Sequence, residues 1–257
     1  MQTFSLDAKA VSDVGLQREH NEDRAGAFPE LGLFFVADGM GGMCSGDRAA
    51  GVVFDTLVEL FERTHGQAQP SLPVEPDPTR CLQENRLNSA VTLSNRRVLD
   101  LVKTNRMFMG IGTTVAALSI QGSTAAIAHL GDSRVYRMRG GKLEALTSDH
   151  SLINEYKRFV PDVSPEVLAE VPKNVITRAG GMGDKVEVDT RHTDVQSGDV
   201  FLITTDGVHL LVSDEQLGGL LSESRNADEC AQCVIDAALK NGGSDNASCV
   251  VVIVRQP

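Results

Sequence analysis

Hydrophobic positions along the chain fall into short continuous runs and longer periodic stretches. Residues 33–37 form an apolar run that ends in Asp38-Gly39, and residues 200–205 are apolar-rich and end in Asp206-Gly207. Short apolar runs bounded by turn residues predict buried strands. The glycine after each carboxylate permits a sharp turn. We therefore expect both acids at the ends of strands.

Two further carboxylates border strand-like runs. Asp132 follows residues 126–131, and Asp245 precedes the Val-rich residues 247–254. If these strands share one core, the four acids can converge on one edge, where they repel one another unless protons or cations neutralise them. Oxygen-only ligands suit Mg²⁺ or Mn²⁺ better than zinc. The pattern thus indicates a site for hard divalent cations.

Elsewhere the strand and helix patterns are grouped rather than strictly alternating. Strands are predicted over residues 3–12, 25–28, 113–120, 124–130, 134–138, 142–146 and 186–192, and helices over 45–64, 79–103, 214–221 and 227–240. Ser45 is the predicted N-cap of the first helix. The short spacing between the middle strands suits antiparallel hairpins. This grouping favours an α+β fold of antiparallel sheets covered by helices over a doubly wound parallel sheet.

Composition and charge indicate the number of domains and exclude some classes of binding partner. A chain of 257 residues with 41% hydrophobic positions can build one large core, so residues 1–257 are expected to form a single domain. The net charge of -11 argues against nucleic-acid binding. The N-terminus lacks a signal-peptide pattern and no long apolar run could span a membrane, so we expect a cytoplasmic protein.

The five cysteines are irregularly spaced, so a disulfide framework is not expected. Cys230 and Cys233 form a single CxxC pair within the predicted helix 227–240. Without a second pair to complete a zinc site, both thiols are expected on the buried face of this helix in a packing role.

Divalent ions held by such carboxylates can make hydroxide available near neutral pH for attack on phosphorus. Arg18 lies four residues before Glu22, close enough in sequence for its guanidinium to grip phosphate oxygens at the same site. Other nucleophile schemes lack their motifs: there is no Gly-x-Ser-x-Gly elbow and no P-loop. Cys44 follows the first acidic motif, but the Cys-x5-Arg cradle of cysteine phosphatases is absent.

Seven short motifs follow one another along the chain. They are Arg18-x-x-Asn21-Glu22-Asp23, Val36-Ala37-Asp38-Gly39-Met40-Gly41-Gly42, Gly112-Thr113-Thr114, Gly131-Asp132-Ser133-Arg134, Ile176-Thr177-Arg178-Ala179, Thr205-Asp206-Gly207 and Asp245-Asn246-Ala247-Ser248. In this order they resemble the motifs of metal-dependent serine/threonine phosphatases of the protein phosphatase 2C type, the PPM family, particularly its bacterial members.

The resemblance implies a four-layer α-β-β-α sandwich with two central antiparallel sheets and a metal cleft at one end. It also implies Mn²⁺ or Mg²⁺ as cofactor, with two ions in the core site and a mobile flap at residues 150–178. The implied core ligands are Asp23, Asp38, the carbonyl of Gly39, Asp206 and Asp245, with Glu22 acting through a metal-bound water, Asp132 sharing a third, weaker site with Asp206, and Arg18 clamping phosphate.

One departure affects the mechanism. Where many eukaryotic relatives have Asp-Gly-His, this chain has Met40, which cannot act as a general acid. His20 and His150 lie near motifs, but structural roles are expected for both. The leaving alkoxide is then expected to take its proton from water, such as one on the third metal, or from a group that the sequence does not identify. Asn246 is expected to orient Asp245.

The resulting hypothesis is a monomeric phosphoprotein phosphatase that hydrolyses phosphoserine and phosphothreonine by direct attack of a metal-bridging water and reverses a cognate Ser/Thr kinase. Two alternatives remain open. A regulatory module that has lost catalysis would be expected to lack metal carboxylates, whereas Asp23, Asp38, Asp206 and Asp245 are all present. A hydrolase of small phosphate esters would share the chemistry and differ only in substrate.

Overall fold

Two antiparallel β-sheets form the centre of the protein. The computed structural model describes residues 4–41, 45–160, 163–172, 175–223 and 225–256. The first sheet has the order β1 (Ser5–Asp13), β11 (Ala247–Arg255), β10 (Val200–Thr204), β7 (Arg134–Arg139) and β8 (Lys142–Ala145). The second has the order β2 (Asp23–Phe28), β3 (Leu33–Met40), β5 (Val115–Gln121), β6 (Thr124–Leu130) and β9 (Asp189–Asp194), with β4 (Gly112–Thr113) paired to β3.

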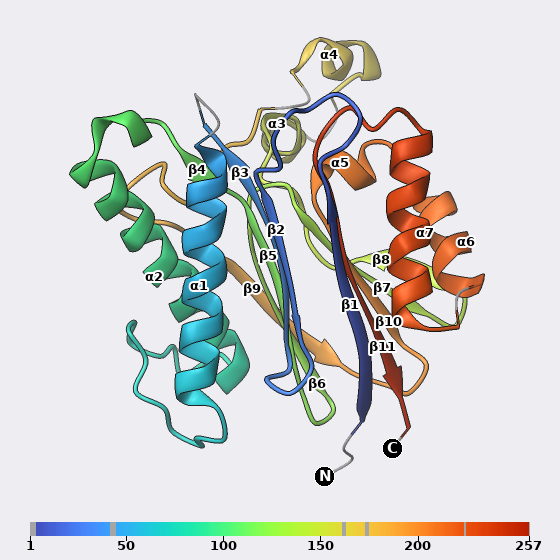
Figure 1. Cartoon of the computed structure of the whole chain (residues 1–257), viewed down its shortest axis with the longest axis horizontal. Helices are drawn as coiled ribbons and strands as arrows, with labels where there is room; N and C mark the ends of the chain where they lie inside the picture. Colours follow the sequence, from blue (N-terminus) through green and yellow to red (C-terminus); the bar gives the residue numbers. More distant parts are fainter. Residues whose placement is uncertain (1–3, 42–44, 161–162, 173–174, 224, 257) are drawn as a thin grey trace.

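Helices cover the outer face of each sheet, so the fold has four layers (Figure 1). The second sheet is covered by α1 (Gly46–Thr64) and α2 (Leu82–Thr104), and the first by α5 (Asp206–His209), α6 (Asp214–Glu223) and α7 (Ala227–Lys240). Near one end of the sandwich lie α3 (Leu152–Phe159) and α4 (Pro165–Glu170), and a short 3-10 helix, η2 (Arg106–Phe108), follows α2. The predicted α+β sandwich with two central antiparallel sheets is confirmed.

Burial on both faces explains why some strands are apolar without alternation. In β3, Phe34 and Val36 pack between the two sheets, whereas Phe35 and Ala37 pack against the helical layer. In β10, Phe201 and Leu202 divide in the same way between the middle and outer layers. A strand with two covered faces needs apolar residues at every position.

Most element boundaries agree with the sequence prediction, and the exceptions have local causes. Helix α2 begins at Leu82 rather than at residue 79, because Cys81 and Glu84 form a capping box there. Strand β9 covers residues 189–194 instead of 186–192, with the register that pairs Ala126 with His192. The single turn α5 was not predicted.

One local prediction is confirmed in position only, and another is wrong. Ser45 is the N-cap residue of α1, as predicted, but it makes no side-chain capping bond; Oε1 of Glu22 accepts the backbone N–H of Gly46 at 2.7 Å. A carboxylate from a distant segment thus satisfies the start of α1, and its charge suits the positive end of the helix. Cys230 is buried, but Cys233 is exposed, because the buried stripe of α7 passes through residues 230, 231, 234 and 235.

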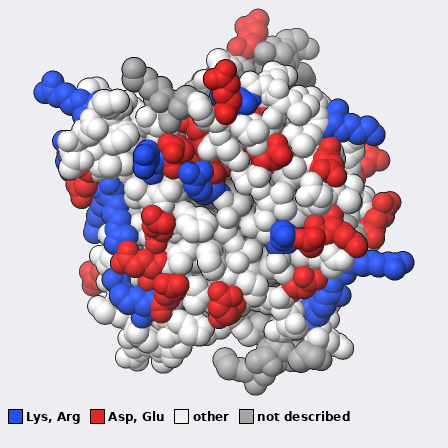
Figure 2. Space-filling model, in the orientation of Figure 1, with Lys and Arg blue, Asp and Glu red and all other residues white. Residues whose placement is uncertain are grey.

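No helix in the described parts of the chain is both long and apolar enough to cross a membrane. On the face seen in Figure 2, acidic and basic side chains are interspersed.

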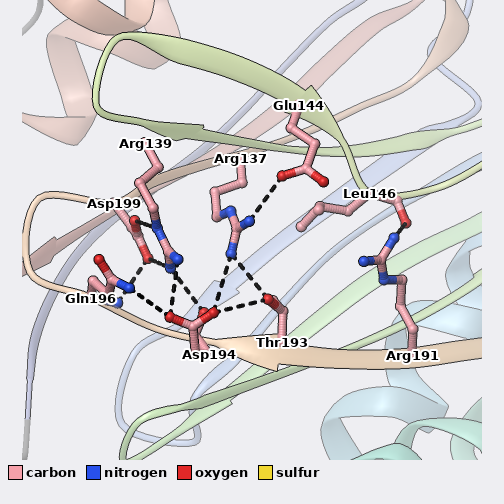
Figure 3. A network of polar contacts seen from close by, with 9 residues as sticks. All are labelled: Arg137, Arg139, Glu144, Leu146, Arg191, Thr193, Asp194, Gln196 and Asp199. Carbon is pink, nitrogen blue, oxygen red and sulfur yellow. Dashed lines mark hydrogen bonds and ion pairs between the residues drawn. The ribbon is translucent and has the colours of Figure 1, made fainter.

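A polar network joins the two sheets along one edge (Figure 3). Arg139 on β7 forms a bidentate ion pair with Asp199, at 2.6 and 2.7 Å, and Asp199 is only 1% exposed. The same guanidinium bonds Asp194 at the end of β9, and Arg137 donates to Thr193 of β9. Strand β7 belongs to the first sheet and β9 to the second, so these contacts fix the sheets relative to each other.

This network leads to a stability prediction. Arg139→Met should lower the free energy of unfolding by about 3 kcal/mol, because it leaves the buried Asp199 carboxylate without its cation. The matched control is Lys103→Met, which removes an exposed pair with Asp100 and should cost less than about 0.5 kcal/mol. Urea unfolding of both variants measures the difference, and equal losses would contradict a specific role for Arg139.

Candidate active site

The hairpin of β2 and β3 brings the first acids together. Asp23 begins β2 and lies directly opposite Asp38, near the end of β3. Glu22 immediately precedes Asp23 in sequence, so all three acids lie at the same end of the second sheet. The arrangement follows from antiparallel pairing, which places the start of one strand beside the end of the next.

The first sheet supplies two more acids at the same end. Asp206 follows β10 and opens α5, while Asp245 precedes β11, and these strands are antiparallel neighbours with Thr204 opposite Cys249. The two segments approach so closely that a Cβ on Gly207 would lie 2.0 Å from the carbonyl oxygen of Asn246. Only glycine permits this contact.

The connection between the sheets supplies the remaining acid. Asp132 lies between β6 of the second sheet and β7 of the first. A pocket of about 300 Å³ opens where these junctions meet. It is lined by seven of the eight residues predicted for the site, namely Arg18, Glu22, Asp38, Gly39, Asp132, Asp206 and Asp245.

Asp23, the eighth predicted residue, is buried rather than in the lining and is only 2% exposed. Its Oδ2 accepts a hydrogen bond from Oγ1 of Thr205 at 2.9 Å. Its Oδ1 is buried without a hydrogen-bond partner among the described residues. A buried carboxylate oxygen is costly unless a donor or a cation satisfies it. This unsatisfied oxygen fits a metal ligand.

Burial and mutual repulsion both raise the pKa values of several acids in the site. Desolvation, with smaller contributions from neighbouring acids, raises the pKa of Asp23 and of Asp132 to about 7 each. Burial also raises the pKa of Asp38 well above its ordinary value and raises that of Asp206, with neighbouring carboxylates adding to both effects. Hard divalent cations would favour the charged forms of these groups. The donor set therefore fits Mn²⁺ or Mg²⁺.

Arg18 and Gly39 both line the pocket. A guanidinium nitrogen of Arg18 lies 2.7 Å from Oδ2 of Asp245, and the Arg18 side chain is 53% exposed at the rim. A Cβ on Gly39 would lie 2.2 Å from the carbonyl oxygen of Gly46. The missing side chain lets the start of α1 approach the end of β3, which brings the Glu22 cap of α1 into the pocket wall.

Hydroxyl groups of Thr114, Ser133 and Thr205 surround the acids, and sequence patterns alone had assigned them no role. Oγ1 of Thr114 accepts the backbone N–H of Asp38 at 3.1 Å and also bonds Oγ of Ser133, next to Asp132. Thr205, by contrast, donates from Oγ1 to the side-chain carboxylate of Asp23. The sequence signal for these hydroxyl residues was their position. Each lies beside a strand end that carries one of the acids, or beside a strand that pairs with such an end.

Asn246 contacts the Asp245 carboxylate, as predicted, but through its backbone, and its side chain has a second role. Its side chain accepts the N–H of Glu22 and donates to the carbonyls of Val14 and His20, so it holds the loop that carries Arg18 and Glu22. Only its backbone N–H contacts Asp245, at 2.8 Å. Asn246 therefore orders the approach of the loop more than the carboxylate beside it.

His150 is structural, as expected. Its ring is 6% exposed; Nδ1 accepts the N–H of Gly131 at 3.1 Å, and Nε2 lies 3.2 Å from Asp189. The carbonyl of His150 accepts the N–H of Thr177, beside Ile176 in the pocket wall. His150 thus connects the turn before Asp132 to the segment before β9.

Neither Met40 nor His20 is placed to transfer a proton in the pocket. Met40 lines the pocket, and His20 is exposed outside the lining. Cys44 and Gly42 lie outside the described residues.

A pocket with carboxylates from both sheets and an arginine at its rim defines the protein as a metal-dependent phosphoester hydrolase. Comparison with known proteins then gives the family. The family model for protein phosphatase 2C matches residues 17–240. The chain belongs to the protein phosphatase 2C family, and it is an enzyme of the serine/threonine phosphatase type.

Similar proteins agree over nearly the whole chain. The serine/threonine phosphatase Stp of Listeria monocytogenes serotype 4b is 33% identical over 250 residues, which are 96% of this chain and 95% of the relative. The Mycobacterium tuberculosis serine/threonine phosphatase PstP/Ppp matches with a TM-score of 0.84 and 30% identity, over 98% of this chain and 100% of that chain. The catalytic domain of PstP in complex with two manganese ions matches at 31% identity, with a TM-score of 0.83 over 98% and 100% of the two chains.

The charge in the pocket predicts that the loss of one carboxylate affects thermal stability differently in the metal-free and metal-bound forms. Metal-free Asp38→Asn should melt at or above the temperature of the metal-free wild type, because it removes a buried ionisable group. Mn²⁺ at about 100 times its Kd should stabilise the wild type by about 2.7 kcal/mol, a rise in Tm of about 5–10 °C. Asp38→Asn should lose most of this rise.

Thermal melts with EDTA and with Mn²⁺ measure both effects. The control is Asp100→Asn on the exposed face of α2, which should retain the full rise. A rise in the Asp38 variant equal to that of the wild type would show that Asp38 does not bind the metal.

Proposed function

We propose that the protein hydrolyses phosphoserine and phosphothreonine monoesters on proteins with two Mn²⁺ or Mg²⁺ ions in the carboxylate pocket. The observation that carries this proposal is the convergence of acids from both sheets with Arg18 on one pocket. The two manganese ions in the related PstP structure support it. The residues assigned to the ions are Asp23, Asp38, Asp206, Asp245 and the carbonyl of Gly39, with Glu22 acting through water and Asp132 with Asp206 at a third, weaker site.

When bound, the metal ions would supply an activated water for direct attack on phosphorus. Arg18 would leave Asp245 and bind the phosphate oxygens, since its half-exposed side chain already reaches the rim. Met40 lines the pocket as an apolar group and transfers no proton. The leaving alkoxide then takes its proton from water.

Residues 150–178 are proposed as a flap that helps to select the substrate. Ile176 lines the pocket, and Thr177 beside it bonds Glu155 of α3. Tyr156 and Phe159 of the same helix are 37% and 73% exposed. Exposed apolar groups beside a pocket favour contact with a polypeptide over a small ester. The substrates would be phosphoproteins made by a cognate Ser/Thr kinase. A non-catalytic binding module is disfavoured because the full carboxylate set lines or underlies the pocket.

Phosphate release from phosphopeptides tests the proposal. With Mn²⁺, phosphoserine and phosphothreonine peptides should be hydrolysed and a phosphotyrosine peptide much more slowly, and excess EDTA should abolish turnover because oxygen-ligated catalytic metals exchange readily. Asp206→Asn provides the inactive control. Full turnover in EDTA would overturn the metal mechanism, whereas a preference for p-nitrophenyl phosphate over every peptide would indicate a small-ester hydrolase.

Arg18→Ala separates phosphate binding from metal binding. It should lower kcat/KM about 10- to 100-fold through the loss of charged hydrogen bonds. Its affinity for Mn²⁺ should be unchanged or higher, because Asp245 loses a competing cation. Arg63→Ala, in the last turn of α1, is the matched control and should match the wild type. Unchanged kinetics in the Arg18 variant would show that this arginine is only a solvated loop residue.

A further inference from the structure

A second group of potential metal ligands lies at the start of α2, outside the catalytic pocket. Cys81 is the N-cap of this helix, Glu84 lies in its first turn, and His192 projects from β9 beside them. Oε2 of Glu84 lies 2.8 Å from Nδ1 of His192. One ligand atom from each of the three residues lies within 4.8 Å of the others.

The fold holds two of these side chains in place before any ion binds. The backbone N–H of Cys81 donates to Oε2 of Glu84 at 2.9 Å, and the sulfur accepts the N–H of Glu84, which completes a capping box. Glu84 is buried at 4% exposure, whereas Cys81 is half-buried and His192 is exposed. An ion can therefore enter from solvent toward a carboxylate that is already fixed.

We propose that Cys81, Glu84 and His192 bind one divalent cation of the zinc class. A thiolate, an imidazole and a carboxylate suit zinc or cobalt, whereas the oxygen-only catalytic pocket suits manganese or magnesium. Bonds of about 2.0–2.3 Å to a tetrahedral ion place its donor atoms about 3.3–3.8 Å apart. The Glu84 and His192 atoms would separate by only about half an ångström from their present contact, and water would fill the fourth position.

The charges and protons balance. Burial raises the pKa of the Cys81 thiol, so the ion must displace its proton, which passes to solvent. The backbone N–H that points at the sulfur stabilises the thiolate once it forms. Nδ1 of His192 faces the Glu84 carboxylate as a donor before the ion binds. On coordination this nitrogen releases its proton to solvent, and the neutral ring carries its proton on Nε2. The thiolate and the Glu84 carboxylate then neutralise the two charges of the cation.

Another group of comparable composition does not suit a cation. His129, His150 and Asp189 also lie within 4.8 Å of one another. A guanidinium nitrogen of Arg178, however, lies 3.0 Å from Asp189 and 3.4 Å from Nε2 of His150. This fixed positive charge occupies the place of a metal ion. No arginine or lysine contact of this kind is recorded for the Cys81 group within the described parts of the chain.

The proposed site is remote from catalysis. The first turn of α2 lies at the end of the molecule opposite α3 and the strand ends that carry the acids (Figure 1). Helix α2 has 23 residues and so separates its two ends by about 35 Å. An ion here would join α2 to β9, an outer strand of the second sheet.

Cobalt binding tests the proposal because a Co²⁺–thiolate bond gives a near-ultraviolet charge-transfer band that carboxylates do not give. The full-length protein is first saturated with Mn²⁺ to fill the catalytic pocket, and then titrated with Co²⁺. One equivalent should develop the band, and Zn²⁺ should remove it by displacement. Cys81→Ser should abolish the band, and His192→Ala should weaken Co²⁺ binding more than about tenfold.

Cys233→Ser, which alters an exposed thiol on α7, and Cys44→Ser are the matched controls and should keep the band. Circular dichroism verifies that each variant is folded. Absence of the band in the wild type, or its persistence in Cys81→Ser, would overturn the proposal. Equal Co²⁺ affinity in His192→Ala would likewise exclude the three-residue site.

Discussion

Repulsion among buried carboxylates at one end of the sandwich is the constraint on which the structure depends. These acids come from the β2–β3 hairpin, from the junctions of β10 and β11, and from the crossing between β6 and β7. Burial raises the pKa values of Asp38 and Asp206, so without cations the pocket favours protonated acids. An assembly that is unfavourable in the metal-free state is ready to bind divalent ions, because their charge removes the repulsion.

The surrounding fold must hold these charges at fixed positions. Hydroxyl groups tie the sheets together at the pocket end: Thr205 of the first sheet bonds Asp23 of the second, and Thr114 bonds Ser133 across the β6–β7 crossing. Away from the pocket, Arg139 of the first sheet bonds Asp194 at the end of β9 in the second sheet (Figure 3). Between these contacts, the layer of apolar side chains shared by the two sheets supplies most of the burial.

Local signals in the sequence predicted the fold where burial is uniform. The runs that became β3 and β10 were recognisable because both faces of each strand are covered. The acids were predicted at strand ends because each carboxylate directly follows or precedes such a run. Long-range contacts were not encoded locally: Ser45 is the N-cap residue of α1, but Glu22 accepts the first backbone N–H of the helix, and Asn246 holds a loop more than 200 residues away in sequence. The periodicity of α7 also failed to distinguish the environments of Cys230 and Cys233.

The catalytic carboxylates and the proposed zinc-class ligands also differ in whether the sequence alone can reveal them. Carboxylates at strand ends can be recognised from sequence, whereas Glu84 and His192 meet across 108 positions because α2 packs beside β9. Zinc binds most ligand sets more tightly than manganese does, so affinity alone does not protect an oxygen-rich pocket from zinc. A thiolate and an imidazole elsewhere on the chain form a stronger zinc site than carboxylates alone. Donor chemistry therefore directs the first zinc ion to α2 and leaves the catalytic pocket to the harder cations.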